Sequence, residues 1–189
     1  HPRPGQDVGA DSGLPIAGMR AAQSIPGAHR VAPNAVQAAT ARRLSAVKAT
    51  VPHFYLAVDA DVRRLLALRE ELDSLSSARL TLNHFLVAAV GRALRDEPSA
   101  NRVWIDDAIL QFEASDVGVA VSTDRGLFVP VVRDAGALSL PELARRTHAL
   151  VERARAGGLT AADIAGGAVT VSNAGMHDVA YMTPIINPG

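Results

Sequence analysis

The stretch Thr170-Val171-Ser172-Asn173-Ala174-Gly175 is the most informative part of this chain, because it joins a strand pattern to a polar turn. Thr170 and Val171 are β-branched and favour a buried strand. A hydroxyl, an amide and two small residues then end the strand, so it delivers polar groups to a tight turn. Such a corner either presents a hydrogen-bond donor to a reacting oxygen or is a plain connection between strand and turn. The six residues alone leave both interpretations open.

The composition excludes several classes of function. The chain has 189 residues, 48% of them hydrophobic, and a formal net charge of zero. The balanced charge removes the usual electrostatic argument for binding nucleic acid or an anionic membrane. No apolar run approaches the roughly 20 residues of a membrane span. The absence of cysteine excludes disulfides, thiolate metal sites and a cysteine nucleophile, and it is consistent with the cytoplasmic location that we expect.

The first 33 residues are expected to form a linker or N-terminal arm. Five of the eleven prolines lie there, and no helical or strand period is sustained. The chain begins with His1-Pro2 rather than methionine, so we expect a processed protein or a fragment. A single domain with a core is expected over residues 34–189.

Helical and strand patterns alternate through this domain, which predicts an α/β (α+β) fold with a mostly antiparallel or mixed sheet. Helices are predicted from Asn34 to Thr50, from Asp59 or Asp61 to Leu72, from Thr81 to Leu94, and from Ser139 to Gly157. Strands are predicted at His53–Val58, Ala108–Phe112, Val117–Ser122, Leu127–Val132, Val169–Val171 and Val179–Ile186, with a hairpin turn at 123–126.

Few motifs in the chain point directly to chemistry. No phosphate loop, dinucleotide fingerprint or zinc motif is present, and the pairs Gly157-Gly158 and Gly166-Gly167 are interpreted as turns. Of the six histidines only His177 is close in sequence to Ser172, and a Ser-His pair within one turn rarely has productive geometry. The residues by themselves therefore predict an α/β domain with an oxyanion or ligand corner near Ser172.

An ordered series of segments extends this interpretation. In chain order they are Ala41-Arg42-Arg43-Leu44, Val47-Lys48-Ala49-Thr50-Val51-Pro52-His53-Phe54-Tyr55, Leu68-Arg69-Glu70-Glu71-Leu72, Pro98 with Asn101 and Trp104, Val117-Gly118-Val119-Ala120-Val121, Gly126-Leu127-Phe128-Val129-Pro130-Val131-Val132, Gly166-Gly167-Ala168-Val169-Thr170-Val171-Ser172-Asn173-Ala174-Gly175-Met176 and Ile185-Ile186-Asn187-Pro188. This series resembles the catalytic domain of the dihydrolipoamide acyltransferase component of 2-oxo acid dehydrogenase complexes.

The resemblance implies a chloramphenicol-acetyltransferase-like fold, a two-layer sandwich with a mixed sheet that forms trimers. In that family the active site is a channel between subunits, which coenzyme A enters from one end and dihydrolipoamide from the other. The implied substrate is therefore coenzyme A or an acyl-CoA, with a lipoyl group on a partner domain and no metal. The implied partners are a homotrimer or larger cage and other subunits of a 2-oxo acid dehydrogenase complex, with no nucleic acid and no membrane.

The resemblance also assigns roles to particular residues. In the family a histidine from a His-x-x-x-Asp-Gly motif removes the acceptor proton, and a serine that Ser172 matches stabilises the tetrahedral oxyanion. Arg69, Thr81, Ser122, Ser172 and Asn173 match positions that contact coenzyme A in related domains. Ser122 stands where some members have aspartate.

One departure from the family leaves two functions open, because residues 1–189 contain no His-x-x-x-Asp-Gly motif. The first is an acyltransferase that moves an acyl group between coenzyme A and a dihydrolipoyl thiol or a small-molecule hydroxyl. The second is a non-catalytic scaffold homologue in the core of a 2-oxo acid dehydrogenase complex. In either case we expect no turnover from the 189-residue chain by itself, because no histidine in it matches the family's base.

Overall fold

The computed structural model describes residues 27–75, 79–179 and 181–186. The chain divides into two units, His1–Asn34 and Ala35–Gly189. Most of the expected N-terminal arm, residues 1–33, therefore lies outside the described residues. None of the described helices is long and apolar enough to cross a membrane.

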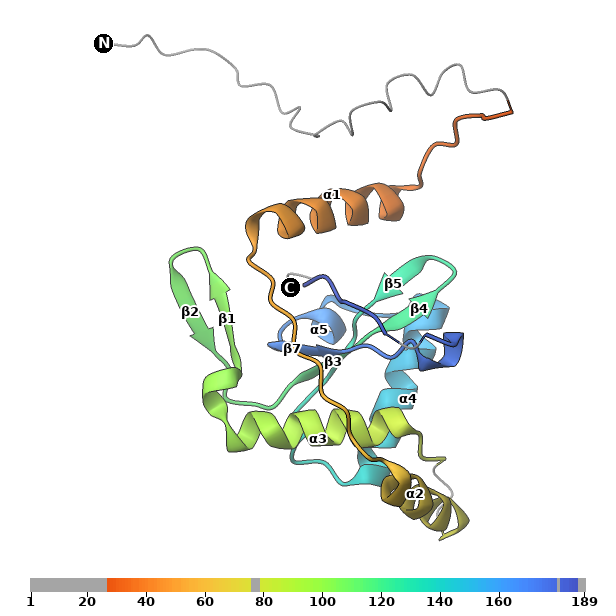
Figure 1. The fold of residues 1–189 in the computed structure, drawn as a ribbon, viewed down its shortest axis with the longest axis vertical. Helices are drawn as coiled ribbons and strands as arrows, with labels where there is room; N and C mark the ends of the chain where they lie inside the picture. The colour runs from red at the N-terminus through yellow and green to blue at the C-terminus, as the bar shows by residue number, and fades with distance from the viewer. Residues whose placement is uncertain (1–26, 76–78, 180, 187–189) are drawn as a thin grey trace. The chain divides into compact units, whose positions relative to one another are not determined.

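The second unit mixes helices with short strands (Figure 1). Its helices are α1 (Ala35–Thr50), α2 (Arg63–Leu75), α3 (Leu82–Asp96), α4 (Leu140–Ala156) and α5 (Ala161–Ile164), with 3-10 turns η2 (Pro98–Ala100) and η3 (Gly175–His177). Its strands are β1 (Arg102–Ile105), β2 (Ala108–Gln111), β3 (Val117–Val119), β4 (Val121–Thr123), β5 (Gly126–Phe128), β6 (Val131–Val132) and β7 (Val169–Val171).

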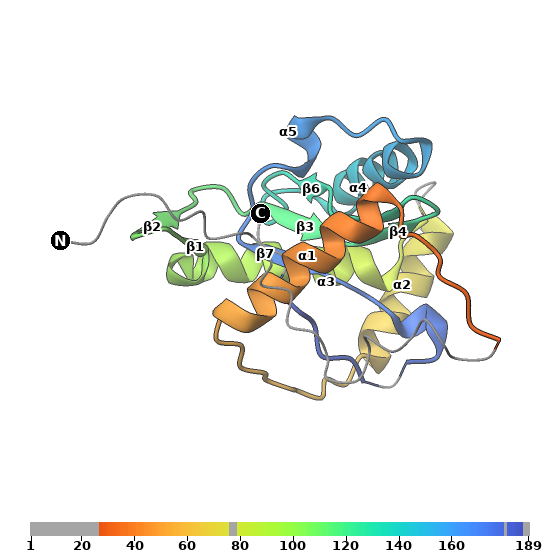
Figure 2. The same cartoon turned by 90° about the horizontal axis from the view of Figure 1, so that it is seen from above.

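The core lies between two helices and a small mixed sheet. The sheet has the order β6-β3-β7, in which β3 runs antiparallel to β6 and parallel to β7. Helices α3 and α4 pack against each other, α3 contacts β3, and α4 contacts β6 and β4 (Figure 2). Val87 from α3, Val117 from β3 and Leu143 from α4 have no exposed surface. The mixed α/β fold and its mixed sheet are therefore as the sequence predicts.

Local sequence signals explain where the helices begin and end. The side chain of Asp61, rather than that of Asp59, accepts the Arg63 N–H at 3.0 Å and so caps α2. Helix α4 has Ser139 at its N-cap and a proline in its first turn. It ends at Gly157, whose φ of +77° is left-handed, as expected for a glycine C-cap.

Two predicted strands are wrong. Residues His53–Val58 form no strand, and none of the described residues from 179 to 186 lies in one. In the described part of the chain, no neighbouring strand pairs with either segment, so the alternation of apolar side chains has no ladder to join. As a result Phe54 is 83% exposed, and Leu56 and Val58 are also highly exposed.

Two other predicted strands are each divided. The expected strand Val117–Ser122 becomes β3 and β4, because β3 pairs in the mixed sheet whereas β4 pairs with β5 in a separate hairpin. The expected strand Leu127–Val132 breaks into β5 and β6 before Pro130, which has no N–H to donate. The β4–β5 hairpin turn at 123–126 is confirmed, whereas β1 and α5 are elements that the sequence analysis missed.

An ion pair fixes the approach to β7. Arg133 donates to Asp116 at 2.6 Å and to the carbonyls of Ala162 and Ala165 at 2.6 and 2.7 Å, which ties α5 to the start of β3. The next residues, Gly166 and Gly167, have φ values of +80° and +84°, a left-handed backbone that favours glycine, and they form part of the irregular connection between α5 and β7. This connection directs the chain into β7, and hence to Ser172.

Candidate functional site

Asn173 holds the corner after β7 through both atoms of its side-chain amide. Its Oδ1 accepts the backbone N–H of Gly175 at 2.8 Å, and its Nδ2 donates to Oδ1 of Asn83 at 2.8 Å. Asn83 lies in the first turn of α3. The corner is therefore shaped locally by one hydrogen bond and attached to the start of a core helix by the other.

Ser172 lies at this corner with its side chain exposed. Among the described residues it has no hydrogen-bond partner, whereas its neighbour Asn173 has two. A serine hydroxyl can donate one hydrogen bond and can also accept, and it rotates to suit its partner. The Ser172 hydroxyl is therefore available to donate to an oxygen of a bound molecule.

Ser122 and Ser172 each come shortly after a strand, β3 and β7 respectively, and these two strands end at the same edge of the mixed sheet. Parallel strands β3 and β7 pair Val119 with Val171, and the N–H of Ala120 donates to the Val171 carbonyl at 2.9 Å. The carboxyl ends of two parallel strands meet at one edge, which is where open α/β sheets bind ligands. Ser122 is exposed and pairs with Leu127 in the β4–β5 hairpin.

Thr81 is the N-cap of α3, the helix to which the corner is attached. Its backbone N–H donates to Nδ1 of His84 at 3.1 Å, and its side chain is exposed. Because Nδ1 is the acceptor, the proton of the neutral ring sits on Nε2. Burial is the main reason that the pKa of His84 falls below its usual value of 6.5, with the charge of His148 acting in the same direction and Asp73 opposing it.

Arg69 lies on α2 with an incomplete set of partners. Its Nε is buried and has no hydrogen-bond partner, and Glu70 is 4.0 Å from its Nη2. Helix α2 packs against α3 and α4, since Leu65 and Leu72 pack on a cluster of Leu80, Phe85 of α3 and Ala144 of α4. The Arg69 guanidinium makes no hydrogen bond among the described residues and its side chain is 33% exposed, so its outer donors are available to an acceptor on a ligand.

Hydrogen bonds connect some of the predicted site residues to one another and leave others unconnected. Asn173 and Ser172 are joined to the start of α3, and thus to Thr81, through Asn83. Ser122 shares their edge of the sheet, but within the described residues neither Ser122 nor Arg69 hydrogen-bonds to the corner. The sequence analysis missed Asn83, and the only available signal was an amide in a helical first turn, which is common at such positions.

Within the part of the chain that the structure describes, no histidine side chain hydrogen-bonds to Ser172. His177 ends η3 with its backbone N–H bonded to the carbonyl of Ala174. His53 is bonded on both ring nitrogens, to the Val51 carbonyl at 2.7 Å and the Ile186 N–H at 3.1 Å. Among these residues there is also no cluster of three or more histidine or acidic side chains that would hold a metal.

Comparison with known proteins identifies the relatives of this chain. The family model of the 2-oxoacid dehydrogenases acyltransferase catalytic domain matches residues 26–189. The chain is 38% identical over 168 residues to the dihydrolipoyllysine-residue acetyltransferase component of the pyruvate dehydrogenase complex of Rickettsia conorii. That match covers 86% of this chain and 41% of the relative, so the chain spans about two fifths of the relative's length.

Solved structures give the same family. The chain matches dihydrolipoamide acetyltransferase of Azotobacter vinelandii with a TM-score of 0.79 and 28% identity, over 85% of this chain and 68% of that one. That structure belongs to a study of a serine, a histidine and an asparagine in the catalytic mechanism. A structure of the cubic core of the pyruvate dehydrogenase multienzyme complex matches with the same TM-score, identity and coverage.

Proposed function

Because the chain belongs to the family of 2-oxoacid dehydrogenase acyltransferase catalytic domains, we propose that it moves an acyl group between coenzyme A and a dihydrolipoyl thiol. The relatives are acetyltransferase components of pyruvate dehydrogenase complexes, which favours acetyl as the acyl group and a lipoyl group on a partner domain as the acceptor. A small-molecule hydroxyl is the less favoured acceptor, because none of these relatives is named for one.

The observation that carries this proposal is the unpartnered hydroxyl of Ser172 at an anchored corner. In the proposed reaction the acceptor sulfur attacks the thioester carbonyl, and the carbonyl oxygen gains negative charge as the tetrahedral intermediate forms. The Ser172 hydroxyl donates to this oxyanion, and collapse of the intermediate releases the thiol of coenzyme A. A donor that is fixed before the charge develops lowers the barrier, because little reorganisation is needed.

Coenzyme A is proposed to lie across Arg69, Thr81, Ser122, Ser172 and Asn173. Arg69 supports this placement because its guanidinium is partly exposed and makes no hydrogen bond among the described residues. A guanidinium is suited to phosphate and carbonyl oxygens because it presents several donors in one plane. The Asn173–Asn83 hydrogen bond supports the placement because it holds the corner at the start of α3, where Thr81 lies.

The acceptor thiol needs a base, which we propose comes from a His-x-x-x-Asp-Gly segment on a neighbouring copy. No histidine of residues 1–189 lies in a His-x-x-x-Asp-Gly motif, so the 189-residue chain by itself is proposed to lack turnover. General base catalysis typically contributes about a hundred- to ten-thousand-fold. A non-catalytic scaffold homologue is the second candidate function, because the exposed apolar side chains of Phe54, Leu56 and Trp104 serve assembly whether or not the domain is catalytic.

Assembly is part of the proposal. We propose a chloramphenicol-acetyltransferase-like trimer that builds a larger cage and receives other subunits of a 2-oxo acid dehydrogenase complex. The relative of known structure forms a cubic core. The exposed apolar side chains of Phe54, Leu56 and Trp104 support the same proposal, because a single chain leaves them in water.

The test is acetyl transfer from acetyl-CoA to dihydrolipoamide. It compares the chain with a version extended by the family's His-x-x-x-Asp-Gly segment, each with and without Ser172→Ala. The extended protein is expected to turn over, and Ser172→Ala is expected to lower its kcat about 10²- to 10³-fold. The KM is expected to change less than the kcat, since the hydroxyl bonds the oxyanion more strongly than it bonds the bound thioester.

Ser99→Ala is the matched control, because Ser99 is an exposed serine in η2, at the end of α3 away from the corner. Its kcat is expected to equal that of the unsubstituted protein. Equal turnover of the short and extended chains would place the base within residues 1–189. Absence of turnover in a folded, assembled extended protein would favour the scaffold function.

A further inference from the structure

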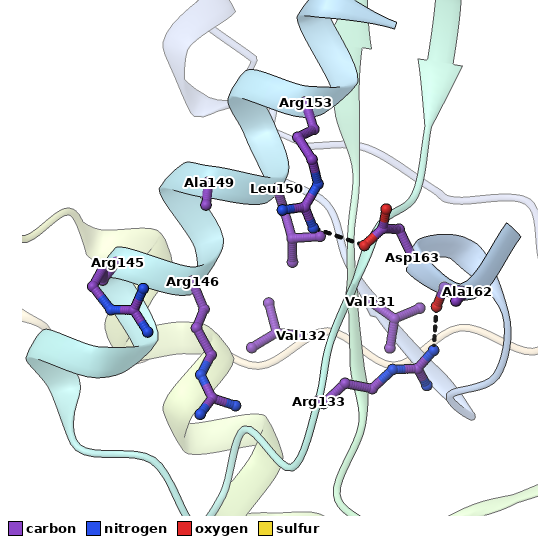
Figure 3. A pocket seen from close by; sticks show the side chains of 10 residues that line it. All are labelled: Val131, Val132, Arg133, Arg145, Arg146, Ala149, Leu150, Arg153, Ala162 and Asp163. Carbon is purple, nitrogen blue, oxygen red and sulfur yellow. Dashed lines mark hydrogen bonds and ion pairs between the residues drawn. The ribbon is translucent and has the colours of Figure 1, made fainter. Parts of the chain in front are cut away.

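A pocket of about 230 Å³ lies at the opposite edge of the sheet from the Ser172 corner (Figure 3). Its floor is apolar and is made by Val131 and Val132 of β6 with Ala149 and Leu150 of α4. Strands β6 and β7 flank β3 on opposite sides, so this pocket and the corner after β7 are separate sites. No part of the proposed acyl transfer uses it.

Four arginines line the pocket, and two of them already have a full structural role. Arg133 is bonded to Asp116 and to the carbonyls of Ala162 and Ala165. Arg145 holds Glu142 through two bonds, from Nε at 2.8 Å and from Nη2 at 2.7 Å. These two guanidiniums line the pocket and give it positive charge, but they leave few N–H donors for a ligand.

The other two arginines keep donors that the protein does not use. Arg146 donates only from Nε, to Glu142 at 2.6 Å, so its Nη1 and Nη2 have no protein partner among the described residues. Arg153 donates only from Nη2, to Asp163 at 2.7 Å. Their side chains are 43% and 46% exposed, respectively, and in Figure 3 Leu150 and the two valines lie between them and Arg133.

The spacing of these two arginines follows from helix geometry. Residues 146, 149, 150 and 153 form one stripe of α4, with the arginines at its ends and Ala149 and Leu150 between them. Seven residues advance a helix by about 10 Å. The two guanidiniums lie at opposite ends of the floor that Ala149 and Leu150 form, so a ligand that bonds both has to span about this distance.

The charges around the pocket favour an anion. The four guanidiniums are faced by the carboxylates of Asp116, Glu142 and Asp163, which leaves one positive charge in excess. Two arginines on one carboxylate hold the pKa of Glu142 at about 2. The Thr160 backbone and side chain, followed by Arg153, hold the pKa of Asp163 below its usual value. Glu142 and Asp163 are therefore ionised near neutral pH, and the four guanidiniums still outnumber the three carboxylates that face them.

We propose that this arginine pocket binds a small organic dianion, with one anionic end on Arg146, the other on Arg153 and an apolar middle on Leu150. Carboxylate and phosphate ends share the required chemistry, because the arginine fork bonds either of them through two parallel N–H donors. The apolar floor and the small volume favour a short carbon chain over a macromolecular partner.

The experiment is a calorimetric titration of the 189-residue chain at low ionic strength, where screening is weakest. The probes are glutarate, butyrate, pyrophosphate and inorganic phosphate. A dianion that spans both arginines is expected to bind at least about tenfold more tightly than the matching single anion, since the second end adds charge-assisted hydrogen bonds. Tighter binding of glutarate would identify carboxylate ends, and tighter binding of pyrophosphate would identify phosphate ends.

Arg146→Gln and Arg153→Gln are each expected to weaken dianion binding about tenfold or more. Arg155→Gln is the matched control, because Arg155 lies on the same helix, pairs with Glu152 at 3.5 Å and does not line the pocket. Binding that is equal in all three variants, or no dianion binding by folded protein, would overturn the proposal. Arg146→Gln is also titrated with coenzyme A, and unchanged affinity there would separate this site from the proposed acyltransferase site.

Discussion

The packed centre of the molecule and its uncovered apolar segments differ in whether a single chain buries their apolar side chains. At the centre, Leu143 and Val117 are 0% exposed and pack with other residues of α3, α4 and the β6-β3-β7 sheet. In the segment before α2, Leu56 is 85% and Val58 is 89% exposed. The β1–β2 hairpin also leaves Trp104 largely exposed. Both regions contain large apolar residues, but only the first one buries them.

Apolar patterning alone therefore does not determine which side chains are buried within one chain. Singly exposed apolar residues are common on protein surfaces, whereas contiguous ones mark places where something else binds. Residues 54–58 are contiguous in sequence and are exposed along their whole length. In the proposed assembly, another copy of the chain covers this segment.

The largest expected effect is on assembly. Leu56→Glu places a charge in the uncovered segment and is expected to convert a trimer or larger assembly of the extended protein into a monomer, since burial of an unpaired charge is costly. Light scattering measures the mass. Ala89→Glu is the control, because Ala89 is an exposed residue on α3 where the same charge stays in water. A monomer before any substitution would contradict the proposed assembly.

The second largest expected effect is on the free energy of unfolding, and it is measured with one buried and one exposed leucine. Leu143→Ala removes a fully buried side chain and is expected to lower the free energy of unfolding by about 2–5 kcal/mol. Leu56→Ala removes the same atoms from an exposed position and is expected to change it by less than about 0.5 kcal/mol at low protein concentration. Urea denaturation measures both values.

Protein concentration provides the control for this pair. The cost of Leu56→Ala is expected to grow as copies associate, because association stabilises the folded state by mass action. The cost of Leu143→Ala is expected to change less with concentration. Equal costs at low concentration would mean that the segment before α2 packs within a single chain.

The sequence predicted elements well where the local signals were strong. Caps and periodicity located α1, α3 and α4 to within a few residues, because Thr81, Ser139 and Gly157 act on their own helices. It failed at His53–Val58, where alternation indicates a strand only if a neighbouring strand exists. It also missed β1, whose partner β2 lies across a turn in which Asp106 adopts a left-handed φ of +52°.

For the candidate site, the sequence indicated individual residues but not their arrangement. The polar turn after Val171 identified Ser172 and Asn173, and the family resemblance added Arg69, Thr81 and Ser122. The hydrogen bond from Asn173 to Asn83 joins residues that are 90 positions apart. No local pattern signals a contact over such a separation, so the anchoring of the corner needed the structure.

The smallest expected effect concerns pH and lies within the packed region. Burial and the charge of His148 lower the pKa of His84, so the folded protein binds its proton less readily than the unfolded chain does. The contribution of neutral His84 to the free energy of unfolding is therefore complete above pH 6.5, and it is lost as the pH decreases towards the folded-state pKa. The fall is expected to be smaller than the effect of Leu143→Ala.

Thermal or urea unfolding between pH 5 and pH 8 measures this dependence. His84→Gln keeps an acceptor for the Thr81 N–H and is expected to flatten the profile. His29→Gln, at an exposed position outside the second unit, is expected to leave the profile unchanged. A profile that keeps its slope in His84→Gln would assign the dependence to other groups.

The most direct test of the central claim is a calorimetric titration of the assembled, extended protein with coenzyme A. The account predicts binding that Arg69→Gln and Asn173→Ala each weaken about tenfold or more. It predicts unchanged binding for Arg64→Gln, since Arg64 is an exposed arginine on the same helix as Arg69. Absence of binding at millimolar coenzyme A by folded, assembled protein would contradict it, as would equal affinity of the Arg69 and Arg64 variants.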